Sequence, residues 1–362
     1  MNIWIDIAHI PQFNFYKRFI HYLSESGHRV YITVLDRGRL ASIVKYENSD
    51  VKNVSVEVIG KHKLSKFSAI VDANIFRLVK LLLWTRGKNI DVAFSNHHQT
   101  SIIARLLRIP GYSFGDDPQT YSYPYFVRFA TQSHMLIYED STNVTLKKDK
   151  VMQVLKEWAY LSPKEFQPNI SALSKYGVEP KKYLFLREVT VGTTNYVGQA
   201  AGAILNVKEL IECVSYIDSD GTTNKMKILF SLEKKNTRNK YPKEWILLQE
   251  PIDDIHSLIY YSAGLVSSGD SMAREAALLG VPSYYLGIRY SMPANAAASK
   301  VANLHNQKTM PFEQWIKTLS ESADVAEKRQ SDLREEINNK FIDINDYMIG
   351  LVNEVANKKG KS

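Results

Sequence analysis

The sequence is very poor in cysteine. Among its 362 residues the only thiol is Cys213, so no disulfide can form within the chain and nothing points to an oxidising compartment. Cys213 stands in the apolar stretch 210–214. We expect it to be a small buried side chain rather than a nucleophile, because no histidine or asparagine is placed to activate it.

Long apolar runs are also missing. No stretch of about 18 uncharged apolar residues occurs. The first residues do not resemble a secretion signal, because they lack a basic start and Asp6 interrupts the apolar run 3–7. The apolar segment 78–84 is short and lies between Arg77 and Arg86, which predicts an amphipathic helix. We therefore expect a cytoplasmic protein, with association at a membrane surface left open.

The sequence also lacks motifs typical of nucleic-acid-binding proteins. The formal net charge is +8, which favours polyanionic partners such as nucleic acid, an anionic membrane face or phosphorylated substrates. Neither zinc-finger spacing nor an aromatic RNP-type motif accompanies this charge, so we do not expect nucleic acid to be the partner. The basic residues between 234 and 243 predict a solvated loop, with a binding patch as the alternative.

What the sequence does contain is a repeated alternation of short apolar runs with amphipathic helical patterns, as in parallel βα units. One series of expected strands runs from 3–7 to 135–138, and a second runs from 183–188 to 283–286. Proline residues mark the segment 151–181 between them. The predicted fold class is therefore α/β, with two Rossmann-like domains facing across a cleft, and ligands are expected at the carboxyl ends of the strands.

The strongest functional pattern is the segment 267–282, Ser-Ser-Gly-Asp-Ser-Met-Ala-Arg-Glu-Ala-Ala-Leu-Leu-Gly-Val-Pro. Backbone N–H groups at the start of its helix can bind an anion such as a diphosphate. Gly269 allows close backbone approach and a positive φ, and Ser271 lies at the helix start. Glu275, expected to be exposed, can accept hydrogen bonds from ribose hydroxyls. The alternative is an ordinary N-cap at Asp270 or Ser271 and a solvated Glu275.

Three further loops after expected strands carry polar side chains. His97 and His98 can act as acid–base groups or hydrogen-bond a sugar, although loop hydrogen bonding is the alternative. Asp116 and Asp117 can bind a cation or accept a proton from an acceptor hydroxyl, although Asp-Asp-Pro is also ordinary turn chemistry. Arg187, near the end of the strand 183–188, can reach a diphosphate with bidentate geometry.

Several segments together resemble an uncharacterised prokaryotic family, the domain-of-unknown-function 354 family, which is grouped with the glycosyltransferase-B superfamily. The segments that carry this resemblance are 4–7 with Pro11 and Phe15, 27–30, 59–62, 91–93, 156–161 and 272–280. They span about residues 1–305. The segment 267–282 is also similar to the nucleotide-binding motif of the lipid II N-acetylglucosaminyltransferase and of the UDP-N-acetylglucosamine 2-epimerases.

The resemblance implies the glycosyltransferase-B architecture. Residues 1–155 would form the acceptor domain and residues 156–325 the nucleotide-sugar domain, with a helix over 326–362 returning to the first domain. The implied function is a nucleotide-sugar-dependent glycosyltransferase in cell-envelope or surface polysaccharide assembly. A UDP-sugar is the expected donor, a glycan or lipid-linked molecule the acceptor, and no metal or other cofactor is required. The open alternatives are a nucleotide-sugar epimerase or hydrolase and a non-catalytic binding protein.

The implied site draws on both domains. The residues expected to bind the nucleotide are Gly269, Ser271, Glu275 and Arg187. Those expected to bind acceptor are His9, Gln12, His98 and Asp117, with His97 or Asp116 as the catalytic base.

Two departures from the family pattern bear on this site. The related loops hold two or three glycines, whereas only Gly269 stands here beside Asp270. A carboxylate next to a diphosphate is repulsive unless a cation or an arginine intervenes. If Asp270 turns away as an N-cap, the anion site survives; if it points into the cleft, non-catalytic binding is favoured. The family's Pro-Pro-His after the first strand reads Ile10-Pro11-Gln12 here, with His9 nearby.

Overall fold

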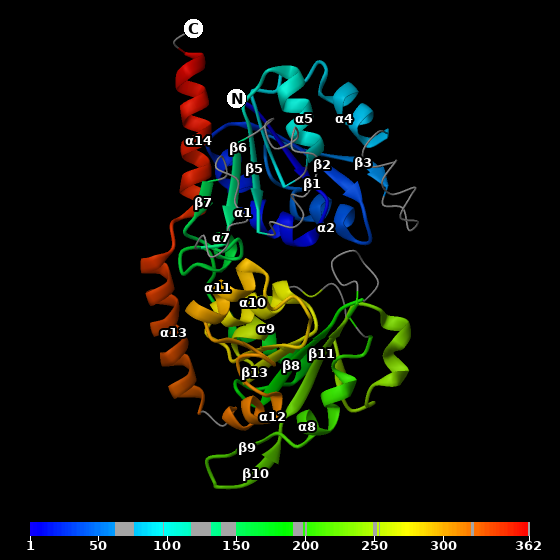
Figure 1. Ribbon diagram of the computed structural model, residues 1–362, viewed down its shortest axis with the longest axis vertical. Helices are drawn as coiled ribbons and strands as arrows, with labels where there is room; N and C mark the ends of the chain where they lie inside the picture. Colours follow the sequence, from blue (N-terminus) through cyan, green and yellow to red (C-terminus); the bar gives the residue numbers. More distant parts are fainter. Residues whose placement is uncertain are drawn as a thin grey trace. The chain divides into compact units, whose positions relative to one another are not determined.

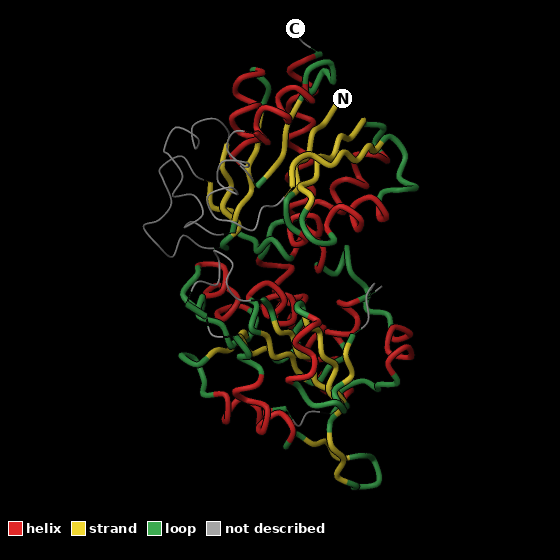
Figure 2. Tube along the Cα trace, turned by 90° about the vertical axis from the view of Figure 1, so that its right-hand side faces the viewer, coloured by secondary structure: helices red, strands yellow, loops and turns green. Residues whose placement is uncertain are grey.

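The computed structural model describes residues 1–61, 76–96, 98–116, 132–138, 150–190, 198–199, 201–248, 252, 254–319 and 322–360. The chain divides into two compact units (Figure 1). Unit 1 comprises Met1–Tyr160 with Phe341–Ser362, and unit 2 comprises Leu161–Lys340. In each unit, parallel strands are covered by helices (Figure 2), so the predicted α/β class with two Rossmann-like domains is confirmed. Within the described part of the chain, no helix is long and apolar enough to cross a membrane.

Unit 1 is built on a seven-stranded parallel sheet with the order β3-β2-β1-β4-β5-β6-β7. Its strands are β1 (Asn2–Ile7), β2 (Arg29–Asp36), β3 (Val54–Lys61), β4 (Val92–Ser95), β5 (Gly111–Gly115), β6 (Gln132–Leu136) and β7 (Lys150–Met152). Its helices are α1 (Ile10–Glu25), α2 (Leu40–Glu47), α4 (Leu78–Thr85), α5 (His98–Leu107) and α14 (Ile344–Lys359), with α7 (Trp158–Leu161) at the boundary between the units.

Both faces of this sheet are covered, which explains why β1 is an almost continuous apolar run. On one face Trp4 packs with Leu81 of α4 and Ile103 of α5. On the other face Phe19 of α1 stacks edge to face on Phe94 of β4. Helix α1 ends where the sequence predicts, because the next residue but one, Gly27, has a φ of +76° and allows a left-handed turn.

Unit 2 holds a six-stranded parallel sheet with the order β12-β11-β8-β13-β14-β15 and a separate antiparallel ribbon. The sheet strands are β8 (Tyr183–Glu188), β11 (Lys227–Leu232), β12 (Ile246–Leu247), β13 (Gly264–Ser267), β14 (Ser283–Tyr285) and β15 (Leu304–Asn306), and the ribbon is β9 (Ser215–Ile217) with β10 (Thr223–Lys225). The α-helices are α8 (Lys208–Glu212), α9 (Ile255–Tyr260), α10 (Asp270–Leu278), α11 (Pro293–Val301), α12 (Phe312–Trp315) and α13 (Ala323–Lys340), and the 3-10 helices are η3 (Ile170–Tyr176), η5 (Leu205–Val207), η6 (Lys235–Lys240) and η7 (Ile316–Thr318).

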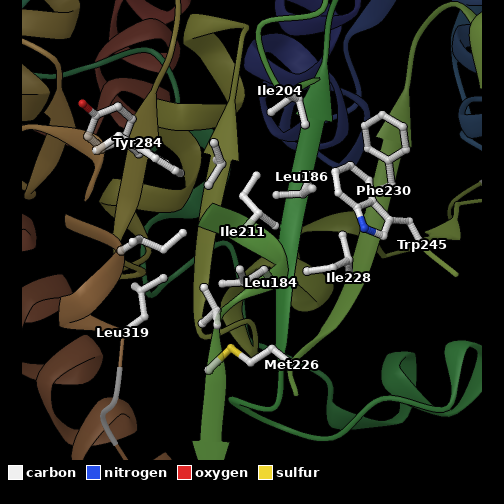
Figure 3. Close-up of a cluster of buried hydrophobic side chains, with 14 of the residues drawn as sticks. Leu184, Leu186, Ile204, Ile211, Met226, Ile228, Phe230, Trp245, Tyr284 and Leu319 are labelled. Carbon is white, nitrogen blue, oxygen red and sulfur yellow. The ribbon is translucent and has the colours of Figure 1, made fainter. Parts of the chain in front are cut away.

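One large hydrophobic cluster of unit 2 lies on one face of this sheet (Figure 3). Leu184 and Leu186 of β8 are fully buried in a cluster with Phe230, Trp245 and Tyr284. Cys213 does not join this cluster. It is exposed and closes α8 as the residue after the helix, where Ile211 is the buried side chain. The expectation of a buried thiol is therefore wrong, because Cys213 comes two residues after the buried Ile211 and so faces the opposite side of the helix end.

The C-terminal segment consists of two helices rather than one. Helix α13 belongs to unit 2, where its buried Gln330 donates to the carbonyl of Tyr260 at 3.0 Å. Helix α14 belongs to unit 1, where Tyr347 lies 3.0 Å from Nε2 of His134. The break comes at Asp343, whose carboxylate accepts from the first backbone N–H groups of α14 and so caps a new helix.

Candidate functional site

Polar residues from five neighbouring strands form one register row at the carboxyl edge of the sheet in unit 2. The row is Ser231, Arg187, Ser267, Tyr285 and Asn306. Each residue is the last or the last but one of its strand. Ligands of open parallel sheets bind at this edge, so the row marks where a site in unit 2 is expected.

Helix α10 begins at this edge directly after β13. Gly269 is its N-cap, with a φ of −106°, a value open to any residue, so the turn does not use the positive φ that glycine allows. The turn is instead held by Ser267, whose Oγ accepts from the N–H of Gly269 at 3.0 Å and donates to its carbonyl at 2.7 Å. The short loop thereby delivers the helix start to the strand end.

Asp270 does not take the role of N-cap, one of the two roles predicted for it. It is instead the first residue of α10. Its Oδ1 accepts from the N–H of Ser271 at 2.9 Å, and its Oδ2 lies 3.0 Å from Nη1 of Arg289 and 3.6 Å from Nη1 of Arg274. The carboxylate is therefore paired with arginine at the positive end of the helix dipole. This pairing reduces the repulsion that a bound diphosphate would meet.

The arginine pair is fixed by a buried network. Arg274, which is fully buried, donates to Oδ1 of Asn295 at 2.6 Å, and Nδ2 of Asn295 donates to the carbonyl of Arg289 at 2.7 Å. The backbone N–H of Arg289 donates to the hydroxyl of Tyr285 at 3.2 Å. Burial raises the pKa of Tyr285 to about 12, with the nearby charge of Asp270 as a second cause. The hydroxyl therefore stays protonated at neutral pH.

Arg289 and Asn295 are site residues that the sequence reasoning missed. Arg289 keeps 17% of its side chain exposed, while Asp270 keeps 7%. The sequence did contain one sign that Arg289 could be a site residue, because it lies in a loop after an expected strand. The same criterion selected His97 and Asp116. Its pairing with Asp270, 19 residues away, is not visible in any local pattern.

Glu275 is buried, not exposed as expected. Its side chain is 6% exposed and its Oε2 lies 3.6 Å from Nε2 of His256 in α9. The ring of His256 packs edge to face against Phe166. Small residues of α10 such as Ala273 and Ala276 are also fully buried, so neighbouring elements approach this helix closely. A freely solvated Glu275 is thereby ruled out, whereas its role toward a ribose stays a prediction.

Arg187 and Glu188 point to opposite sides of the strand, as their adjacent positions require. Nη1 of Arg187 donates to Oγ of Ser231 within the register row, at 2.9 Å. Glu188 accepts from the N–H of Ile204 at 2.9 Å and from the hydroxyl of Ser268 at 3.1 Å, and burial raises the pKa of its carboxyl group. Glu188 thus ties loops together, while Arg187 stays among the polar groups of the carboxyl edge.

Unit 1 has a polar register row of its own. It runs through Glu57, Thr33, Asp6, Ser95, Ser113 and Ser133. The carboxylate of Asp6 is fully buried and accepts from both terminal nitrogens of Arg77, at 2.7 and 3.0 Å. It also accepts from the hydroxyls of Thr33 at 2.6 Å and Thr100 at 3.2 Å. The aspartate that interrupts the first apolar run is therefore the centre of a buried ionic network.

His9 and Gln12, two of the residues predicted to bind acceptor, follow the carboxyl end of β1. His9 is the N-cap residue of α1, and its Nδ1 lies 2.7 Å from Nη1 of Arg37. Nε2 of His9 lies 3.0 Å from the same nitrogen of Arg37. Since a guanidinium group only donates, the ring nitrogen that takes this hydrogen bond is the unprotonated one. Oε1 of Gln12 accepts from the N–H of Ala8 at 2.9 Å, which closes the turn into the helix.

Asp116 follows β5 and forms an ion pair with Lys156, at 2.5 Å between Oδ2 and Nζ. Lys156 was part of the family resemblance but was not predicted as a site residue. The amide of Asn96 donates to the carbonyl of Phe114, so the loop after β4 is tied to the end of β5. His97 and Asp117 lie outside the described residues. His98 begins α5, and its side chain also falls outside the described part.

Metal-binding clusters were searched among the described side chains only. There, no three histidine, cysteine, aspartate or glutamate residues come together closely enough to hold a metal ion. The charged groups at the start of α10 are instead an arginine-rich set around one carboxylate. Such a set can bind a phosphate group through charge-assisted hydrogen bonds.

Comparison with known proteins places this geometry in context. Residues 1–111 match the family model described as "Protein of unknown function (DUF354)", which confirms the family resemblance over that range. No curated protein matches the chain.

Three solved structures illustrate the fold likeness. The glycosyltransferase of kitacinnamycin is 14% identical, with a TM-score of 0.63 and 98% of each chain covered. The glycosyltransferase VinC, solved in complex with dTDP, is 11% identical, with a TM-score of 0.61, 99% of this chain and 100% of that chain covered. The UDP-N-acetylglucosamine 2-epimerase from Neisseria meningitidis, bound to its nucleotide sugar, is 14% identical, with a TM-score of 0.58, 99% of this chain and 100% of that chain covered. The chain therefore has the two-domain, Rossmann-like fold of glycosyltransferase-B enzymes and of these epimerases.

Proposed function

We propose that the protein is a nucleotide-sugar-dependent glycosyltransferase that binds its donor in unit 2. The observation that carries the proposal is the start of α10 at the carboxyl edge of the sheet, where Arg289 and Arg274 flank Asp270. A helix start with guanidinium groups beside it suits a diphosphate. The fold supports the same assignment, since structures with this fold were solved with dTDP and with UDP-N-acetylglucosamine.

The chemistry requires negative charge on the leaving diphosphate to be stabilised. In the proposed arrangement Arg289, the helix dipole of α10 and Arg187 supply this stabilisation without a metal ion. Glu275 would hold the ribose, and the turn at Gly269 and Ser271 would bring backbone close to the phosphates. A UDP- or dTDP-sugar is the donor we propose to test first.

The acceptor would bind unit 1. We propose that Asp116 or His97 removes the proton from the acceptor hydroxyl as the glycosidic bond forms. Lys156 positions the carboxylate of Asp116 through the ion pair at 2.5 Å. His9, Gln12, His98 and Asp117 would line the acceptor site. A glycan or lipid-linked acceptor in envelope or surface polysaccharide assembly is the substrate class we propose.

A second candidate function is binding of a nucleotide or sugar without catalysis. One observation favours it: Oδ1 of Asp270 already accepts from the N–H of Ser271 at the helix start, at 2.9 Å. A carboxylate in that place takes up a donor that a phosphate would otherwise use. The pairing of Asp270 with Arg289 weighs against this alternative, because it offsets the negative charge.

Two measurements on three proteins test the proposal. Thermal-shift screening against UDP-, dTDP-, GDP- and CMP-sugars should find one donor that stabilises the fold, by about 2.7 kcal/mol at a hundred times its Kd. Release of nucleoside diphosphate is then followed with that donor. Asp116→Asn should abolish turnover if Asp116 is the base and leave most of it if His97 is the base, and in both cases it should keep donor stabilisation. Asp218→Asn, which removes another lysine-paired aspartate at 2.7 Å, should change neither. Stabilisation by no donor would refute the proposal, and stabilisation without turnover would favour the binding protein.

A further inference from the structure

Unit 1 exposes large apolar side chains on the neighbouring helices α4 and α5 and just before the start of α4. Phe76, Val79, Leu83 and Leu106 are 57%, 49%, 56% and 60% exposed. The first three recur at intervals of three and four residues, so they lie on one side of successive helical turns. Large apolar side chains gathered on a surface mark an interaction site more often than single ones do. We call these four residues, with the basic residues around them, the α4–α5 surface.

The amphipathic helix predicted for this segment is not what α4 forms. Its inner side carries Leu81, fully buried in the cluster with Trp4 and Ile103. Its outer side should be polar in a helix that faces water, yet it presents Val79 and Leu83 together with Lys80. The helix is therefore apolar on both sides, and packing within unit 1 accounts for only one of them.

The two segments that carry these side chains hold charged residues of one sign only. Residues 76–88 and 98–110 contain no aspartate or glutamate. Besides Arg77, which is paired with Asp6 inside the unit, they hold five basic residues: Lys80, Arg86, Lys88, Arg105 and Arg108. The nearby Asp91 is bonded to Lys359. The α4–α5 surface is therefore strongly positive around an apolar centre.

A hollow beside Leu106 adds a place for an anionic group. It has a volume of about 560 Å³ and is lined by Arg105, Arg108, Ile109 and Pro110. Guanidinium groups bind phosphate through two parallel hydrogen bonds. Because α5 ends here and leads into β5, the hollow lies at the amino edge of the sheet, opposite the edge that holds Asp116.

We propose that the α4–α5 surface docks unit 1 on an anionic lipid bilayer. Phe76, Val79, Leu83 and Leu106 enter the boundary between headgroups and acyl chains, and Arg105 and Arg108 bind lipid phosphates. Apolar side chains surrounded by basic ones are what an interfacial helix uses for such binding. A second copy of the same surface is disfavoured as the occupant, because two positive faces would repel each other. The inference is independent of the proposed transferase activity.

Vesicle co-sedimentation of the full chain tests this docking. The protein should bind vesicles of phosphatidylcholine with phosphatidylglycerol, should bind phosphatidylcholine alone at least about tenfold more weakly, and should lose affinity as salt is raised. Val79→Gln with Leu83→Gln should weaken binding more than about tenfold, because tenfold corresponds to only about 1.4 kcal/mol. The double variant Arg105→Gln, Arg108→Gln should bind the anionic and the neutral vesicles with the same affinity.

Matched controls come from unit 2. Ile217, which is 74% exposed, is replaced by glutamine as the apolar control, and Lys234→Gln with Lys235→Gln is the charge control. Both should bind vesicles like the parent, and all variants should keep its unfolding midpoint and donor stabilisation. Equal binding to both vesicle types, or equal losses in the controls, would overturn the inference. The inference would also be overturned if the double variant Val79→Gln, Leu83→Gln changed its oligomeric state but bound vesicles as the parent does.

Discussion

The two units use the carboxyl edges of their sheets in different ways. In unit 1 the charged centre is Asp6 with Arg77, whose side chains are 0% and 2% exposed, and every described contact of the pair stays within the unit. In unit 2 the charged centre is Asp270 with Arg289, and Arg289 keeps 17% of its side chain exposed. A fully buried ionic network such as that of Asp6 and Arg77 stabilises a fold. A partly exposed one such as that of Asp270 and Arg289 is able to bind a ligand. The charged centre at this edge thus serves structure in unit 1, whereas the one in unit 2 is available for ligand binding.

The largest expected loss of stability tests the buried ionic network of Asp6 and Arg77. Asp6→Ala leaves the guanidinium of Arg77 buried without its carboxylate, which should cost about 3–5 kcal/mol of unfolding free energy. Urea unfolding followed by fluorescence measures it. Arg289→Gln, which alters the partly exposed pair, should cost much less. Similar losses for the two variants would remove the distinction between the units.

The next largest expected loss of stability tests whether the buried contact of Glu275 with His256 stabilises unit 2. Because its carboxylate is buried and faces His256, Glu275→Ala should lower stability by about 1–3 kcal/mol, in contrast to the near-neutral change expected for an exposed helical glutamate. Glu275→Gln keeps the shape of the side chain and should cost less. If calorimetry finds the alanine variant as stable as the parent, the buried contact has no energetic importance.

The smallest expected change in stability comes from replacing Tyr285. Its pKa is raised from 10 in the unfolded chain to about 12 in the folded protein, so its contribution to stability is complete below pH 10 and is lost as pH rises towards 12. Tyr285→Phe should cost about 1 kcal/mol at pH 7, for the lost hydrogen bond to Arg289. Above pH 10 the variant should lose less stability with rising pH than the parent. Parallel pH profiles for the two proteins would contradict this account.

The fold could be predicted because its signal is local. Apolar runs such as β1 and β8, and the glycine that ends α1, each determine their structure within a few residues. Arg289 and Lys156 could not be assigned in the same way. Their partners Asp270 and Asp116 lie 19 and 40 residues away, and only the folded sheet brings them together.

The burial of α10 shows a second limit. Its Arg-Glu pair follows the pattern of a solvated helix surface, so Glu275 was expected to be exposed. Small residues, Ala273, Ala276 and Ala277, let neighbouring elements pack closely around the helix, and Arg274 and Glu275 are buried with them. The charge pattern is local, whereas the packing that overrides it involves α9 and α11 from elsewhere in the unit.

Isothermal titration of matched ligands tests the central claim that the start of α10 in unit 2 binds a diphosphate. UDP and uridine, or dTDP and thymidine, are titrated into the parent, Arg289→Gln and Arg329→Gln; Arg329 donates to the carbonyl of Gly280 beyond the other end of the helix. We predict that Arg289→Gln weakens diphosphate affinity at least about tenfold, since a charge-assisted hydrogen bond contributes about 1.5–3 kcal/mol. Nucleoside affinity should stay unchanged, and Arg329→Gln should resemble the parent. Equal diphosphate affinity in the parent and Arg289→Gln would contradict the account.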